Sequence, residues 1–206
     1  MIPRINRKCA IAVYCLLFLT INTAALKAQN RQLVWADEFN ETTIDRSLWS
    51  FGKGPGNDNV HYYTDRPQNA RIESGILRII ALEESYEGFN YTSALLNTKN
   101  SVNWRYGRIE ARIKQPGTNG FVPAFWMMPV NDQYGWWPMS GEIDIMEHPT
   151  NSVDKIFCGV HFGVYDPITG SESRGTNIQV PDAEAAFHIY AIEWTPDKID
   201  FYIDNR

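Results

Sequence analysis

The chain has 206 residues, of which 44% are apolar, 21% charged and 13% aromatic. This is the composition of a folded globular domain, and it excludes a disordered chain, a collagen-like repeat and a small disulfide-rich scaffold. The formal charge is −5, and residues 29–206 carry 15 basic against 24 acidic residues. Such an acidic body argues against nucleic acid as a partner, because binding to phosphates needs clustered Lys and Arg.

The first 28 residues have the pattern of a cleaved secretory signal peptide. Three basic residues lie among the first eight, and they precede an apolar run over residues 9–19. This run is too short for a membrane span of about 20 residues, and the small residues after it place the cleavage point after Ala28. A retained N-terminal anchor is the alternative. We therefore predict a protein secreted to the extracellular space or periplasm, with no stable membrane insertion after cleavage.

Residues 29–206 are predicted to form one domain of short strands. Alternation of apolar and polar residues is clearest over residues 108–114, and no window of a dozen residues shows a helical stripe. The predicted strands are 70–82, 91–97, 107–114, 121–128, 142–147, 157–164, 186–194 and 199–204. The predicted loops are 52–59, 115–120 and 166–175. Short strands between Gly and Pro turns favour an antiparallel sandwich. Cys158, alone once the signal is removed, is interpreted as a small buried apolar residue.

Three acidic residues stand close together in residues 141–148, which read Gly-Glu-Ile-Asp-Ile-Met-Glu-His. In a regular strand, Glu142 and Asp144 share one face. Glu147 joins them if one extra residue forms a β-bulge, for which Met146 is the candidate. The two glutamates are then about 13 Å apart at Cα and roughly 5 Å apart at their carboxyl groups. That separation is typical of retaining rather than inverting glycosidases.

Neighbouring carboxylates divide their roles, because like charges keep one of them protonated at neutral pH. Glycoside hydrolysis needs this division, with one ionised nucleophile and one proton donor. We expect Glu147 to titrate above an ordinary glutamate because its neighbours are negative. A solvated acidic strand face, or a metal site built from oxygen ligands, would show the same residues. The adjacent Trp136 and Trp137 favour the glycosidase, since sugar rings stack on aromatic faces.

Residues 137–147, Trp-Pro-Met-Ser-Gly-Glu-Ile-Asp-Ile-Met-Glu, resemble the E-x-D-x-x-E signature of glycoside hydrolase family 16 in its laminarinase-like form. Further blocks that resemble the family are 35–40, 62–66, 75–81, 106–112, 123–128, 188–197 and 201–204. The resemblance implies a concanavalin A-like jelly roll, a β-sandwich of two curved antiparallel sheets with a concave substrate cleft. It also implies a secreted retaining endo-glycosidase that hydrolyses laminarin-type β-1,3-glucan by double displacement.

The same resemblance assigns roles to individual residues. Glu142 is the nucleophile, Glu147 is the general acid/base, and Asp144 between them tunes their protonation and position. The positions that match sugar-facing residues of relatives are Asn69, Arg108, Trp126, Trp137 and His161. For Arg108 the alternative is a surface charge paired with a nearby acid. We interpret His148 as a residue that caps the strand.

The resemblance implies no required cofactor and allows one structural calcium ion, with Glu38 and Gly75 as ligands. Relatives often have Trp at the position of Val122, so one wall of the cleft is expected to be less aromatic. Because the family normally adds residues beyond the position of Arg206, we expect the C-terminal strands of the sandwich to be missing. We expect a monomer that binds a polysaccharide. The alternatives are another substrate (mixed-linkage β-glucan, agar or carrageenan) or a non-catalytic glycan-binding sandwich.

Overall fold

The computed structural model describes residues 31–56, 59–117, 120–148, 154–166 and 171–206. The chain divides into two compact units, residues 1–38 and 39–206, and all of the strands belong to the second. The predicted signal peptide and its cleavage point lie outside the described residues. Within the described part of the chain, no helix has the length and apolar character needed to cross a membrane.

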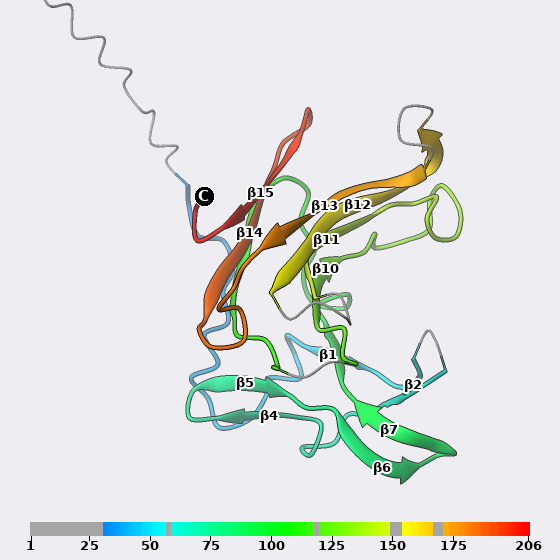
Figure 1. The fold of residues 1–206 in the computed structure, drawn as a ribbon, viewed down its shortest axis with the longest axis vertical. Helices are drawn as coiled ribbons and strands as arrows, with labels where there is room; N and C mark the ends of the chain where they lie inside the picture. Colours follow the sequence, from blue (N-terminus) through cyan, green and yellow to red (C-terminus); the bar gives the residue numbers. More distant parts are fainter. Residues whose placement is uncertain (1–30, 57–58, 118–119, 149–153, 167–170) are drawn as a thin grey trace, which may run out of the picture. The chain divides into compact units, whose positions relative to one another are not determined.

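Every regular element of the described residues is a strand (Figure 1), which confirms the predicted all-β class. The strands are β1 (Ser50–Gly52), β2 (Gly54–Pro55), β3 (Tyr62–Tyr63), β4 (Ala70–Glu73), β5 (Ile76–Ile79), β6 (Leu82–Tyr86), β7 (Phe89–Ser93), β8 (Leu95–Asn97), β9 (Gly107–Ile113), β10 (Ala124–Met127), β11 (Glu142–Glu147), β12 (Lys155–Asp166), β13 (Ser171–Gln179), β14 (His188–Trp194) and β15 (Ile199–Ile203). The pairings are antiparallel except that of β3 with β7, which is parallel.

Two of the sheets make the sandwich that positions the site. One has the strand order β10-β11-β12-β13 and the other β15-β14-β9. Their facing sides form the apolar core, whose buried members are Ile145, Met146, Ile156, Cys158, Val180, Ala183, Tyr190 and Ile192. In β14, the core residues Tyr190 and Ile192 are two positions apart and so share one face of the strand. Since this core covers only one side of the β10–β13 sheet, the other side can carry polar chemistry.

Cys158 belongs to this core, as the sequence predicts. Its Sγ lies 3.2 Å from the carbonyl oxygen of Ile145, to which the thiol donates a hydrogen bond. Burial raises the pKa of the Cys158 thiol to about 12. A thiol that stays protonated at neutral pH is a poor nucleophile, so Cys158 acts through packing.

The strand that carries the acids is irregular where the sequence predicts a bulge. Against β10, Ile145 has no partner between the paired residues Asp144 and Met146. Against β12, the single residue Cys158 faces both Ile145 and Met146. Both bulged side chains are buried in the core. The bulge therefore spans Ile145 and Met146, and it returns Glu147 to the face of Asp144.

The loop predicted over residues 166–175 is wrong in part, because β13 begins at Ser171. This strand pairs in continuous register with β12 from Gln179 opposite Lys155 to Ser173 opposite His161. Its sequence, Ser-Glu-Ser-Arg-Gly-Thr-Asn-Ile-Gln, contains one large apolar residue, Ile178, which packs against the core. An outer strand with a single core contact shows no apolar alternation, so the periodicity could not reveal it.

The predicted strand 70–82 is a hairpin of β4 and β5 followed by the start of β6. Ser74 and Gly75 form its turn with φ values of +55° and +71°, in the left-handed region that glycine adopts without strain. The predicted loop 52–59 is also wrong in part, because it contains the short strand β2. The proposed calcium ligand Gly75 thus lies in a tight turn, while Glu38 is an exposed residue of the other compact unit. The calcium site stays a prediction.

Candidate active site

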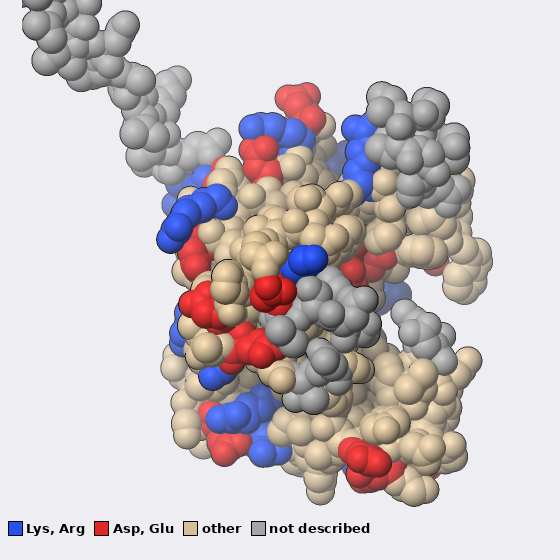
Figure 2. Space-filling view, viewed as in Figure 1, with Lys and Arg blue, Asp and Glu red and all other residues tan. Residues whose placement is uncertain are grey.

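The three acids predicted to act together lie on the face of β11 that points away from the core. Glu147 lines a hollow of about 370 Å³ on this face. The other lining residues are Val122, His148, Phe157, His161 and Asn177. Val122 is exposed at the hollow, so one wall is aliphatic as the sequence predicts. On the surface in view in Figure 2, the Lys and Arg side chains of the described residues lie among Asp and Glu side chains.

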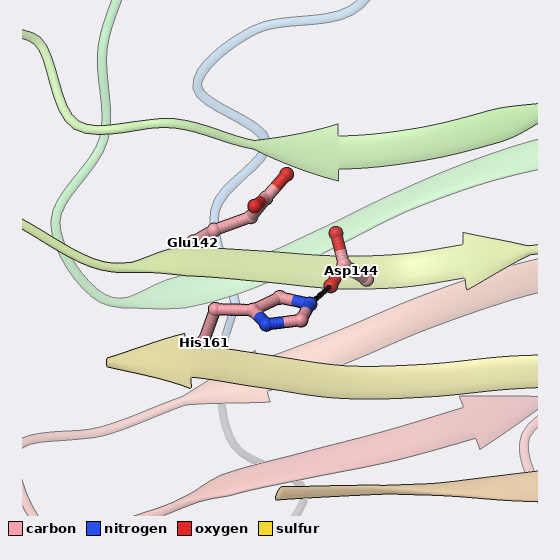
Figure 3. Close-up of side chains that lie close together, drawn as sticks. All are labelled: Glu142, Asp144 and His161. Atoms are coloured by element: carbon pink, nitrogen blue, oxygen red, sulfur yellow. Dashed lines mark ion pairs between the residues drawn. The ribbon is translucent and has the colours of Figure 1, made fainter. Parts of the chain in front are cut away.

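Asp144 is the central and most deeply buried of the three acids, with 1% of its surface exposed. In Figure 3 its side chain rises from β11, and its Oδ2 lies 3.1 Å from Nε2 of His161 on β12. Burial raises the pKa of Asp144 to about 8, helped by the negative charges of Glu142 and Glu147 and a hydrogen bond with Glu142. Asp144 therefore holds a proton at neutral pH, which relieves the repulsion among the three carboxyl groups.

Glu147 also has a raised pKa, and the predicted direction is confirmed. Its largest cause is burial rather than neighbouring charge, with the negative charge of Glu142 second and His161 acting in the opposite direction. A carboxyl group whose charged form is disfavoured in this way is suited to donate a proton.

Glu142 has a different environment. The indole Nε1 of Trp137 donates a hydrogen bond of 2.5 Å to its Oε2. A donor aimed at a carboxylate oxygen stabilises the negative charge, and such charge-assisted bonds are stronger than neutral ones. The ring of Trp137 is 55% exposed and its centroid lies 5.4 Å from that of His161. Trp126 pairs with Asp144 across β10 and β11 and so shares the face of the acids.

The hydrogen bond from Trp137 can be tested separately from its ring. The substitution Trp137→Phe keeps an aromatic side chain but removes the N–H donor to Glu142. We expect kcat/KM for the glycoside hydrolysis that the sequence predicts to fall by about 10- to 100-fold, because hydrogen bonds to charged groups contribute about 1.5–3 kcal/mol. Trp136→Phe is the matched control, since Trp136 is adjacent and 84% exposed. Equal losses in the two variants would show that the donor has no special role.

Asn69 does not fit the predicted contact with sugar. Its side chain is fully buried. Its Nδ2 donates to the carbonyl oxygen of Ile80 at 3.1 Å and to Oγ1 of Thr92 at 2.9 Å, and its Oδ1 accepts from Thr64 and Arg66. A carboxamide with no exposed surface and four internal partners cannot also bind a sugar. Asn69 instead joins the start of β4 to β7.

Arg108 does not lie with the acids either. It belongs to β9, on the outward face of the other sheet, where it donates to Glu110 at 2.6 Å and to Glu193 at 3.2 Å. Its Nη2 donates a further hydrogen bond of 2.7 Å to Oδ1 of Asn205. The alternative of a surface charge paired with acids is the correct one. Alternation places Arg108 on the polar face of its strand but does not say which sheet that face belongs to.

Three residues that line the hollow were not predicted to bind substrate. His148 is almost fully buried, and its backbone N–H donates to the carbonyl oxygen of Pro123 at 3.1 Å. Its imidazole also lines the hollow, so the interpretation as a strand cap is incomplete. Phe157 and Asn177 are paired residues of β12 and β13. Counting back in steps of two from His161 along β12 would have placed Phe157 on the same face.

The site also has the donor set of a metal centre. One ligand atom from each of Glu142, Asp144 and His161 lies within 4.8 Å of the others. Of the sequence-based alternatives, a metal site thus remains geometrically open. A cation would have to displace the proton that Asp144 holds at neutral pH, since ligands bind in their deprotonated form.

Comparison with known proteins agrees with the fold. A beta-glucanase from Rhodothermus marinus is 44% identical over 186 residues, which cover 87% of this chain and 65% of that protein. A glucan endo-1,3-beta-glucosidase from Cryptopygus antarcticus is 39% identical over 182 residues, 84% of this chain and 67% of that protein. The X-ray structure of the laminarinase from Rhodothermus marinus matches with a TM-score of 0.79 at 42% identity, covering 84% of this chain and 72% of that one.

These matches confirm the predicted jelly-roll sandwich, although the chain spans only 65% of the length of the Rhodothermus beta-glucanase. The model of glycosyl hydrolases family 16 matches residues 56–206, which include both main sheets and all three acids. The chain therefore belongs to family 16 of the glycosyl hydrolases.

Proposed function

We propose that the protein is a retaining endo-glycosidase that hydrolyses β-1,3-glucan of the laminarin type. The observation that carries this proposal is the contrast between Glu142 and Glu147 on one strand face. Glu142 accepts a hydrogen bond that stabilises its carboxylate, whereas burial raises the pKa of Glu147 and favours its protonated form. Retaining hydrolysis needs one carboxyl group in each of these states. Relatives named beta-glucanase and laminarinase support glucan as the substrate class.

In the first half of the proposed reaction, Glu142 attacks the anomeric carbon of the sugar at the scissile bond. Glu147 gives its proton to the glycosidic oxygen as that bond breaks, so the leaving chain departs as a neutral alcohol. The product on the protein is a glycosyl ester of Glu142. Asp144 is neutral at this stage and so adds no negative charge beside the nucleophile.

In the second half, Glu147 is a carboxylate and takes a proton from water. The water oxygen attacks the anomeric carbon from the side that the leaving group vacated, and the ester bond to Glu142 breaks. Two inversions give net retention of configuration, and both glutamates return to their starting states. No step requires a cofactor, and the proposed calcium ion is structural. A polymer as substrate agrees with the secretion that residues 1–28 predict.

The proposal is tested with the full chain and laminarin. We expect release of soluble oligosaccharides, with the β-anomer of the new reducing end appearing first in a proton NMR time course. Mixed-linkage β-glucan, agar and carrageenan serve as parallel substrates, and faster release from one of them would reassign the substrate. Initial formation of the α-anomer would exclude the retaining mechanism. Binding of laminarin without any release would support the non-catalytic alternative instead.

A further inference from the structure

The hollow beside Glu147 contains an aromatic ring that lies low against the sheet. Phe157 of β12 is half-buried and lines this hollow. The next residues on the same face are Gly159 of β12 and Gly175 of β13, which pair with each other. A β-carbon on Gly175 would lie 2.3 Å from Cζ of Phe157, and one on Gly159 would lie 2.7 Å from the same atom. The tip of the ring therefore fills the space that two side chains would otherwise occupy.

Both this ring and the neighbouring backbone exclude a side chain here, because a β-carbon on Gly159 would also lie 2.8 Å from the carbonyl oxygen of Arg174, and one on Gly175 would lie 2.8 Å from that of Cys158. Neither Gly159 nor Gly175 has a positive φ, so neither is needed for a left-handed conformation. Side chains on a strand normally stand roughly perpendicular to the sheet. Phe157 instead reaches two residues along its own strand and across to the next. The ring therefore lies over the two glycines, and Phe157 lines the hollow.

The register places the ring beside the proposed acid/base. Glu147 pairs with Phe157, and Asp144 pairs with Gly159. The ring consequently extends from the row of Glu147 toward the row of Asp144. Glu142 pairs with His161, one row further along. An aromatic surface therefore lies next to the point where the proton is transferred in the proposed reaction.

We propose that Phe157 is a substrate-binding residue that stacks against a glucosyl unit next to the scissile bond. Both faces of a β-linked glucosyl ring present axial C–H bonds, so they are apolar and fit an aromatic surface, while the hydroxyl groups point outward from the rim. Asn177, which pairs with Phe157, and His161 provide polar groups at the margin. An apolar platform bordered by a few polar groups is the usual composition of a ligand site.

This inference rests on the proposed function and is tested by binding, which does not depend on turnover. Titration calorimetry with laminarihexaose is performed on the Glu142→Gln protein, with and without Phe157→Leu. We expect Phe157→Leu to weaken binding by about five- to tenfold, because leucine keeps bulk but has no planar face. Phe157→Tyr, which keeps the ring, is expected to bind within about twofold of the parent.

Phe125→Leu is the matched control, since Phe125 lies in the same sheet but packs against the core. Both leucine variants are expected to lower the thermal unfolding temperature, and only Phe157→Leu should weaken binding. Binding by Phe157→Leu within twofold of the parent, or equal weakening by Phe125→Leu, would overturn the inference. If binding depends on Phe157 but the wild type hydrolyses nothing, the inference stands and the enzymatic function fails. If the Glu142→Gln parent does not bind laminarihexaose, both the glucan assignment and the inference are overturned.

Discussion

Replacing Glu142 with glutamine is expected to lower kcat for laminarin by at least about 10⁴-fold, because the substitution removes the attacking carboxylate. Glutamine has nearly the same shape, and its amide oxygen can still accept the hydrogen bond from Trp137. The affinity for laminarihexaose should therefore change little. Rates are measured as reducing ends released from laminarin, and affinity is measured by calorimetry.

The control for this substitution is Glu83→Gln, which changes an exposed glutamate on β6. It should leave both kcat and affinity unchanged. A Glu142→Gln variant that keeps more than about a tenth of the wild-type kcat would remove Glu142 from the role of nucleophile. A variant that loses affinity and activity together would point to a binding role instead.

The substitution Asp144→Asn is expected to stabilise the protein at alkaline pH. The carboxyl group of Asp144 has a pKa of about 8 in the folded protein, whereas an aspartate in an unfolded chain has a pKa of about 3.9. Between these values the folded state binds more protons than the unfolded state, so the stability falls as pH rises from about 4 to about 8. Asparagine cannot ionise, and the variant loses this part of the pH dependence.

The difference in unfolding free energy between Asp144→Asn and wild type should thus be small near pH 4 and grow to a few kcal/mol by pH 8, since each pKa unit is worth about 1.4 kcal/mol. Urea unfolding at pH 4, 6 and 8 measures it. Asp132→Asn, a change of an exposed loop residue, should show no such trend. A stability difference that is the same at all three pH values would contradict the buried, protonated state of Asp144.

The acids and their bulge could be predicted because both depend on local rules. Alternation puts Glu142 and Asp144 on one face, and only an added residue can bring Glu147 to it; the structure shows that residue in a bulge at Ile145 and Met146. His161 and Trp126 also lie on this face, as paired residues of the neighbouring strands. The acids follow from spacing within a strand, whereas Trp126 and His161 follow from the resemblance of their positions to sugar-facing residues of the family.

The predictions for Arg108 and Asn69 are wrong because the surroundings of these residues depend on packing between segments that are far apart in the sequence. Arg108 lies on a polar strand face as expected, but that face belongs to the sheet without the acids. Asn69 is polar and follows a turn, yet partners from three separate segments bury it completely. The ring of Phe157 lies low because Gly159, two positions along the same strand, and Gly175, 18 positions along the chain on the partner strand, have no side chains. The alternation of apolar and polar residues in the sequence reveals none of these contacts.

The bulge in β11 contributes both to the packing of the core and to the spacing of the two glutamates. Ile145 and Met146 are consecutive, and both are inserted into the core between the sheets. Deleting either residue would move Glu147 to the opposite face and would also leave an apolar site in the core unfilled. A genetic screen that selects only for soluble, folded protein would therefore preserve the spacing of the two glutamates, even if no glucan were ever present.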